Sequence, residues 1–231
     1  MMKQPIIVFL SMSEVQHLHR IARRYNCKTI VSYLINIIIN SPDKDILAIH
    51  TDLMVKASKF NANEIVEFFI EEKNITPNFV DRETGCSILS WATRNNNESL
   101  VYYLLDNYKM DLDHQDNLGF TALHWACENQ NFSMVEQITC KGANVDVINS
   151  DGYTPIYLVL SSENRNSIDI VKCLLDKDAN TFVMEDNSLI YKDLAEFAFV
   201  RDCHFIEKII TKYRDSICKL RYTYKDLDDY Q

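Results

Sequence analysis

Glycine and proline are scarce in this chain of 231 residues, which contains four of each. Glycine-rich phosphate-binding loops and the G-x-S-x-G turn of many hydrolases both need two or more glycines within a few residues. No two of the four glycines lie that close, and the zinc-binding pattern H-E-x-x-H does not occur. We therefore expect a protein that is not an enzyme, with no catalytic and no cofactor-binding residue.

The sequence also lacks a disulfide framework and long apolar runs. Its seven cysteines are odd in number and scattered, with no C-x-x-C pair, which fits reduced thiols in the cytosol or the nucleus. Residues 34–39 are too few to cross a bilayer, and residues 5–10 are shorter than the core of a secretory signal. We expect no membrane partner and no secretion.

A metal site is not expected either. His17 and His19 are two residues apart, so on a helix they would point about 200° away from each other. Only Cys27 lies nearby in the sequence, whereas zinc needs three or four converging ligands.

Clusters of basic residues are missing from the middle of the chain. Residues 51–211 carry 13 Lys/Arg and 26 Asp/Glu, a net charge of −13, whereas residues 1–50 carry +3 and residues 212–231 carry +1. Proteins approach phosphate backbones with clustered Lys and Arg. We therefore expect no direct nucleic-acid binding, and a protein partner that presents a basic segment suits this charge better.

The few glycines are placed at regular intervals. Gly85, Gly119 and Gly152 are 34 and 33 residues apart, and they open the similar segments GCSILSWA, GFTALHWA and GYTPIYLV. Such phasing indicates a repeated turn that needs a left-handed backbone. Each segment continues into an apolar helical pattern, so the repeat unit is predicted to be a turn followed by helices.

Paired alanine and valine positions extend this register along the chain. The pairs Ala22/Val31, Ala57/Val66, Ala92/Val101 and Ala126/Val135 all keep a nine-residue gap. In the next unit Val159 is followed by Val171, twelve residues on. This spacing predicts a three-residue insertion between two helices, within residues 161–167.

These motifs resemble the ankyrin repeat, whose unit has a T-P-L-H-like helix start, a V-x-x-L-L stripe and a G-A-D/N loop. Residues 121–124 (TALH) and 142–144 (GAN) match that pattern closely. The resemblance implies an all-α solenoid of stacked helix-turn-helix units. We expect about six repeats over residues 12–213, clearest over 82–182, with an N-terminal extension at 1–11 and a C-terminal tail at 214–231.

The resemblance also places a concave binding surface on the turn tips and on the exposed side of the first helix of each unit. By position, this surface is predicted to contain Glu83, Cys86, Arg94, Asn95, Asn117, Leu118, Phe120, Glu128, Asn129, Ser150, Asp151, Tyr153, Ser161 and Ser162. Phe120 and Tyr153 both follow a turn glycine. They are interpreted either as binding anchors or as rings that pack on the neighbouring turn.

Three further residues receive structural interpretations. His124 is expected to brace its turn by hydrogen bonding, as the corresponding histidine does in ankyrin-like units. Trp91 and Trp125 lie 34 residues apart at the same repeat position, which favours core or half-buried packing over a ligand-binding aromatic box.

The function that follows is that of an adaptor or inhibitor, expected to be a monomer, that binds a partner protein. A narrower hypothesis is an inhibitor similar to those that retain NF-κB-type transcription factors, including inhibitors of the kind encoded by some viruses and parasites. The competing class is an enzyme with an exposed reactive cysteine such as Cys127 or Cys203.

Overall fold

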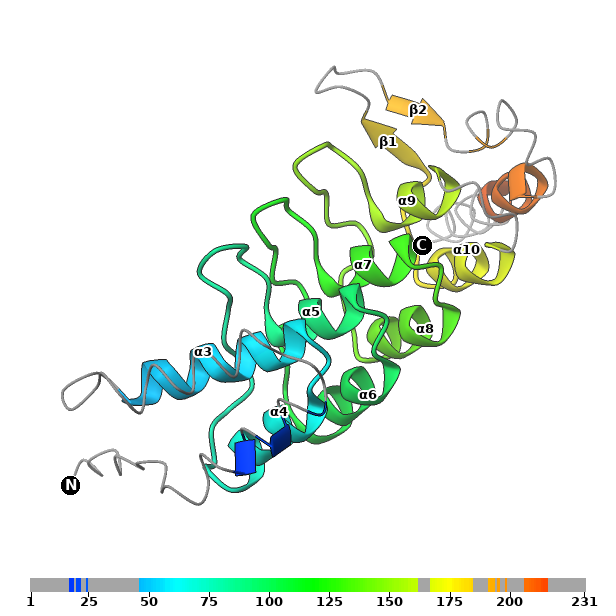
Figure 1. The fold of residues 1–231 in the computed structure, drawn as a ribbon. Helices are drawn as coiled ribbons and strands as arrows, with labels where there is room; N and C mark the ends of the chain where they lie inside the picture. Colours follow the sequence, from blue (N-terminus) through cyan, green and yellow to red (C-terminus); the bar gives the residue numbers. More distant parts are fainter. Residues whose placement is uncertain are drawn as a thin grey trace, which may run out of the picture. The chain divides into compact units, whose positions relative to one another are not determined.

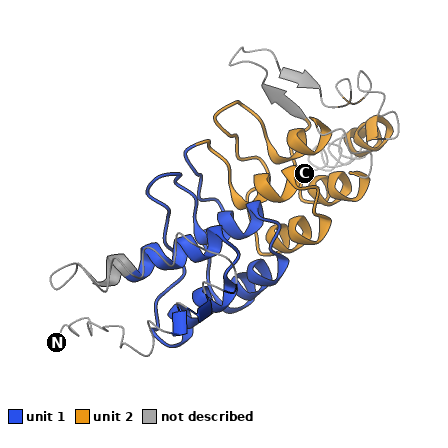
Figure 2. Ribbon diagram, in the orientation of Figure 1, with its two compact units in different colours: residues 1–117 blue, residues 118–231 orange. Residues whose placement is uncertain are grey.

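The computed structural model describes residues 17–18, 20–21, 24, 46–161, 167–184, 191–193, 195, 198 and 206–215. The chain divides into two compact units, residues 1–117 and 118–231 (Figure 2). We describe each unit by itself.

Unit 1 contains two helical hairpins. The first consists of α3 (Ile46–Lys59) and α4 (Asn63–Glu71), and the second of α5 (Ile88–Arg94) and α6 (Glu98–Asn107). The two helices of each hairpin pack together, and α3 also packs on α5. Figure 1 shows α3 and α5 in one layer of the unit and α4 and α6 in the other. We call the first member of each hairpin, here α3 and α5, the first helix of its repeat, and the second member, here α4 and α6, the second helix.

Unit 2 repeats this arrangement. The first helix α7 (Ala122–Glu128) packs on α8 (Phe132–Cys140) and on α9 (Pro155–Ser161), while α10 (Ile168–Leu175) packs on α8 and α9. A short antiparallel hairpin of β1 (Phe182–Met184) and β2 (Tyr191–Asp193) follows, and residues 206–215 are helical. The predicted all-α class is confirmed, and the hairpin is a small addition that the sequence analysis did not predict.

The core follows the alanine and valine register. The alanines at the first-helix position and the valines at the second-helix position are all fully buried. They are Ala57, Ala92, Ala126, Val66, Val101 and Val135. A methyl side chain allows helices to approach closely, and the valines fill the space between the layers at close-packed density. The register read from the sequence is therefore confirmed over these three repeats.

The helix boundaries are evenly spaced in the first three hairpins. Three residues separate the two helices of each, at 60–62, 95–97 and 129–131. Residues 162–166, between α9 and α10, lie outside the described residues, so the insertion expected there stays a prediction. Side-chain caps fix several of these starts: Ser87 and Thr121 cap first helices, and Asn97 and Asn131 cap second helices.

Some predictions fall outside the described residues. They are the extension at 1–11, the repeat position at Ala22 and Val31, the residues of the tail after 215, Ser162 and Cys203. The domain boundaries at 12 and 213 accordingly stay predictions. Among the described residues, no helix is both long and apolar enough to cross a membrane.

Candidate binding surface on the turn tips and first helices

A polar residue shapes each turn tip from within. In unit 1, the carboxylate of Asp81 accepts hydrogen bonds from the Glu83 N–H (3.0 Å) and the Thr84 hydroxyl (2.8 Å). In unit 2, the side-chain oxygen of Asn149 accepts from the N–H groups of Asp151 (3.0 Å) and Tyr153 (2.8 Å). These internal bonds hold each tip in one conformation before any partner binds, which lowers the ordering cost of binding.

Hydrogen bonds also join successive tips within each unit. In unit 1, Asn117 donates from its backbone to the Thr84 carbonyl (3.0 Å) and from its side chain to the Glu83 carbonyl (3.0 Å). In unit 2, the Ser150 N–H donates to the Leu118 carbonyl (3.0 Å). The tips within a unit therefore form a continuous polar edge.

Two stacked aromatic pairs cover the first helices of unit 2. The rings of Phe120 and Trp125 lie 4.5 Å apart between centroids, and those of Tyr153 and Tyr157 lie 4.3 Å apart and nearly parallel, at 17°. All four side chains are half-buried. We call these four residues the aromatic surface. The predicted anchors Phe120 and Tyr153 thus stack on the first helix of their own repeat.

Exposed apolar and acidic side chains extend this surface on the turn tips. Leu118 is 54% exposed and Ile148 is 47% exposed. Glu128, at the end of α7, and Asp151 are exposed as well. No Lys or Arg occurs on α7 or α9. The first-helix side of unit 2 therefore combines aromatic rings with negative charge.

His124 braces the turn of its repeat, as predicted. Its side chain is fully buried. The Nδ1 atom accepts from the Thr121 N–H at 3.1 Å, so Nε2 carries the proton and donates to the carbonyl of Tyr153 at 3.1 Å. Both ring nitrogens are engaged, which leaves neither available as a ligand or general base.

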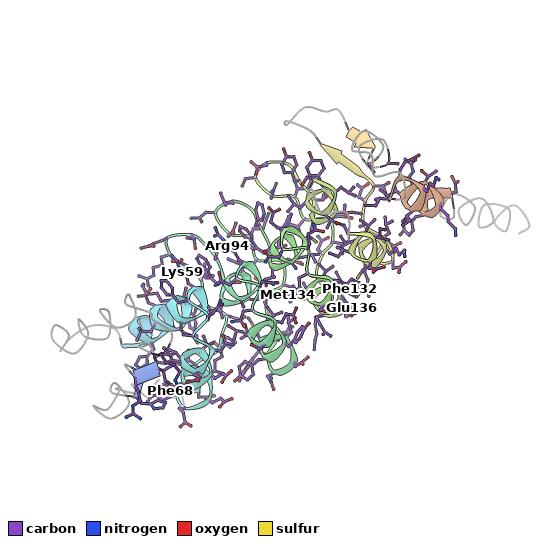
Figure 3. The ribbon with its side chains drawn as sticks, turned by 45° about the vertical axis from the view of Figure 1, so that its right-hand side comes forward. Lys59, Phe68, Arg94, Phe132, Met134 and Glu136 are labelled. Carbon is purple, nitrogen blue, oxygen red and sulfur yellow. The ribbon has the colours of Figure 1, made fainter. Side chains whose placement is uncertain are left out.

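Unit 1 carries cations where unit 2 carries acids. The Lys59 ammonium lies 4.9 Å and the Arg94 guanidinium 5.1 Å from the ring centre of Trp91. The indole is only 6% exposed. Figure 3 shows Lys59 and Arg94 together on one side of the unit and Phe68, from α4, on the other. The first-helix sides of the two units therefore differ in charge.

Asp81 is electrically coupled to this group. Burial raises the pKa of its carboxyl, but the Glu83 N–H, the Thr84 hydroxyl and the positive charge of Lys59 together outweigh burial. The net effect is a lowered pKa. The indole N–H of Trp91 is buried and has no hydrogen-bond partner of normal geometry within the described residues.

The predicted surface residues fall into four groups. The exposed ones are Glu83, Arg94, Asn117, Leu118, Glu128, Ser150 and Asp151, and the half-buried ones are Asn95, Phe120, Asn129, Tyr153 and Ser161. Cys86 is buried, and Ser162 lies outside the described residues. Twelve of the fourteen side chains therefore keep some contact with solvent.

Cys86 is a correction to the predicted surface. Its thiol lies 3.4 Å from the Asp116 carboxylate, to which it donates, and its side chain is 1% exposed, because the turn folds this position inward. Asn95 also serves the fold: its amide donates to the carbonyls of Ser58 (3.2 Å) and Lys59 (2.9 Å) at the end of α3. It ties two first helices together.

Tyr157 and Lys59 belong to the first-helix sides but were not among the predicted residues, although the sequence holds signals for them. Tyr157 follows Tyr153 by four residues, and α9 begins between them at Pro155, so the two rings can stack at the start of the helix. Lys59 precedes Arg94 by 35 residues, the same interval that separates Ala57 from Ala92. Lys59 and Arg94 therefore occupy the same position of successive repeats.

Cys127, one of the two cysteines named for the competing enzyme hypothesis, is not exposed. It is fully buried, and burial, followed by the neighbouring Cys173 and the negative charge of Glu128, raises the pKa of its thiol well above the ordinary value. A buried thiol of raised pKa is a poor nucleophile, so Cys127 does not support that hypothesis. Among the described residues, no group of three or more His, Cys, Asp or Glu could hold a metal ion.

Comparison with known proteins identifies the repeat. A family model of three ankyrin repeats matches residues 53–149, which include α4–α8 and the second half of α3. This chain carries ankyrin repeats. The expected family resemblance is thereby confirmed, and with it the general role of such repeats in binding other proteins.

Relatives of this ankyrin-repeat chain are diverse. It is 30% identical over 172 residues to the ankyrin repeat protein FPV031 of Fowlpox virus (strain NVSL), which covers 74% of this chain and 49% of the viral protein. It is 32% identical over 89 residues to the mouse BCL-6 corepressor-like protein 1 (38% of this chain, 5% of that protein). It is 39% identical over 56 residues to the human scaffold protein ILK (24% and 12%). The chain thus spans about half or less of each of these relatives.

Proposed function

We propose that this chain is an adaptor or inhibitor that binds a partner protein through its turn tips and first helices, the side that the ankyrin resemblance predicts to be concave. The observation that carries the proposal is the aromatic surface of unit 2. Its four rings come from two repeats, and Phe120 and Tyr153 occupy the same position in each. Half-buried aromatic rings next to exposed apolar residues are typical of binding hot spots.

The charge of unit 2 supports a partner with a basic segment. Glu128 and Asp151 supply negative charge beside Phe120, Trp125 and Tyr153. Lys and Arg side chains bind well to such a surface, because their charges pair with carboxylates while their stems lie on aromatic rings. Complementary charge of this kind speeds association and improves selectivity more than it adds affinity.

Within this class, a narrower candidate is an inhibitor that covers a basic segment of an NF-κB-type transcription factor. The acidic and aromatic side of unit 2 supports it. It requires the protein to act in the cytosol or the nucleus, which we propose as its location. A fluorescent fusion of the full chain would test the location, and secretion of the fusion would contradict it.

The binding proposal is tested by removing the anchors. The full chain is used to capture partners from host cells, and the association and dissociation rates of a captured protein are then measured. Replacing Phe120 and Tyr153 with Ala should weaken binding by at least tenfold, because hot-spot rings contribute about 2 kcal/mol or more. Each loss also costs the fold about 0.5–1.5 kcal/mol of ring stacking.

A matched control removes an aromatic ring elsewhere. Phe132 is 39% exposed on the second helix α8, so Phe132→Ala should leave binding unchanged. Replacing Glu128 and Asp151 with Lys should slow association and flatten its salt dependence. Equal losses for Phe132→Ala and the anchor variants would show that the first-helix side is not the recognition surface.

A further inference from the structure

We propose that the first-helix side of unit 1 binds an acidic segment of a protein partner, with an Asp or Glu carboxylate placed between Lys59 and Arg94. This inference rests on the proposed function and assigns a partner chemistry to unit 1 that is the opposite of the one at unit 2. It also departs from the expectation, drawn from the net charge of residues 51–211, that this whole region favours basic partners.

The two cations are held in place before a partner arrives. Lys59 ends α3 and Arg94 ends α5, and α3 packs on α5. Both charged groups lie about 5 Å from the centre of the Trp91 ring, a distance at which a cation is attracted to the face of an indole. Since ordering a long side chain costs conformational free energy on binding, cations that already rest on a buried ring lose less.

Lys59 has little competition for its charge. It forms no ion pair within the described residues, and the carboxylate whose pKa its charge lowers, that of Asp81, already accepts from Glu83 and Thr84. Lys56, one turn earlier on α3, is by contrast bound to Asp52 at 2.7 Å. The Lys59 ammonium therefore keeps capacity for a further carboxylate.

The acidic residues of the unit 1 helices are concentrated on the other layer. The second helices α4 and α6 carry five acids and no Lys or Arg, namely Glu64, Glu67, Glu71, Glu98 and Asp106. Burial, followed by the like charges of Glu71 and Glu64, raises the pKa of Glu67, which reflects this crowding. The first helices α3 and α5 carry three cations and one acid, Asp52, which is paired. The net negative charge of the unit thus conceals a positive side.

The size of the positive group favours a short peptide segment over a long polyanion. Nucleic acids and anionic membranes are bound by many Lys and Arg residues along a track. Here the first helices carry two cations at the Trp91 ring, and the second layer is acidic. A peptide with one or two carboxylates can meet both cations without approaching the second layer.

The experiment uses the full chain with Trp125→Phe, which leaves Trp91 as the single tryptophan of the two in the sequence. Its fluorescence is titrated with an acetylated peptide of six glutamates, a matched peptide of six lysines, a dT20 oligonucleotide and phosphatidylserine vesicles, each across a salt series. The glutamate peptide should give a saturable change that weakens as salt rises. Replacing Lys59 and Arg94 with Glu should weaken this binding at least tenfold.

Lys109→Glu is the matched control, because Lys109 is exposed in the same unit and its reversal changes the charge as much as each of the two single reversals. It should leave the titration unaltered. If circular dichroism shows that the double charge reversal does not fold, Lys59→Met with Arg94→Gln removes both charges and keeps the stems, and it should still reduce binding several-fold. No response to the glutamate peptide, an equal loss in the Lys109 control, or tighter binding of lysine peptide, oligonucleotide or vesicles would overturn the inference.

Failure here is distinguishable from failure of the proposed function. A captured partner that loses binding when Phe120 and Tyr153 are replaced, yet binds normally when Lys59 and Arg94 are reversed, would support unit 2 as the recognition surface and overturn the role of unit 1 alone.

Discussion

The Nε2 atom of His124 lies 3.1 Å from the carbonyl oxygen of Tyr153, in the next repeat. With Nδ1 accepting from the Thr121 N–H in its own repeat, this one imidazole satisfies buried backbone groups of two successive repeats. Burying such groups without partners costs about 1–3 kcal/mol each. His124 is thus a structural connection between repeats.

Replacing His124 with Ala should therefore lower the free energy of unfolding by about 2–4 kcal/mol. The buried Thr121 N–H loses its acceptor, the Tyr153 carbonyl keeps only the hydrogen bond from the Asn149 N–H, and the space of the buried ring is left empty. Urea titration of the full chain measures this loss. His114→Ala is the control: His114 is half-buried and makes one bond, from Nε2 to the Gly85 carbonyl at 2.7 Å, so its loss should be about half as large or less. Equal midpoints for both variants would contradict the connecting role.

Two glycines with similar backbones should respond differently to Ala. Gly119 and Gly142 have φ of +75° and +95°, where a Cβ costs about 1–2 kcal/mol of backbone strain. A Cβ at Gly119 would also lie 2.6 Å from the Ser150 nitrogen, whereas nothing lies within 4 Å at Gly142. Gly142→Ala should cost about 1–2 kcal/mol and Gly119→Ala at least twice that. The unfolding midpoints of the two variants in urea measure this difference. Equal midpoints would contradict the close contact between Gly119 and the turn at Ser150.

Asp81 makes part of the stability depend on pH. Because its pKa is lowered in the folded state from the ordinary 3.8, its contribution is complete above about pH 5 and is lost as the pH falls through the folded-state value. Asp81→Asn should keep the turn, since Asn149 fills the same role in unit 2. The difference in unfolding free energy between the two proteins should be under about 1 kcal/mol at pH 7 and should shrink on acidification. A difference in unfolding free energy that grows below about pH 4 would contradict a lowered pKa of Asp81 in the folded state.

The described cysteines should label in an order set by burial. Cys140 is exposed and Cys127 is fully buried with a raised pKa, and alkylation requires an accessible thiolate. Iodoacetamide at neutral pH, followed by peptide mass spectrometry, should modify Cys140 within minutes and Cys127 only as fast as the protein opens. Adding urea serves as the control, because it should equalise the two rates. Rapid labelling of native Cys127 would restore the hypothesis of a cysteine enzyme.

Much of this fold could be predicted from the sequence because its repeat imposes identical demands every 33–35 residues. A turn glycine such as Gly119, a small residue such as Ala126 and a valine such as Val135 each meet one steric requirement, and their spacing fixes the helices between them. The hairpin of β1 and β2 lies after the clearest repeats and has no such register. Nothing in its six residues distinguishes it from the start of another unit.

The charge of the surface was less predictable, because a net charge summed along the sequence does not distinguish the first helices from the second helices. Summing residues 51–211 gave −13, although the helical period separates Lys59 and Arg94 on first helices from acids such as Glu67 on second helices. The inward position of Cys86 depends on its contact with Asp116, thirty residues away. Local patterns do not encode such a contact.

Lys59 and Arg94 occupy the same position of two successive repeats, and the equivalent residues of the next two repeats are Glu128 and Ser161. This repeat position therefore holds a cation in two repeats, an anion in the third and a neutral hydroxyl in the fourth. Two residues earlier, Ala57, Ala92 and Ala126 are completely buried. Mutation at the position of Lys59 and Arg94 changes the charge that a repeat offers to a partner, while the buried alanines two residues earlier still pack the helices together. Point mutation can therefore move such a protein from one partner to another in single viable steps, and lineages that share this stack need not share a target.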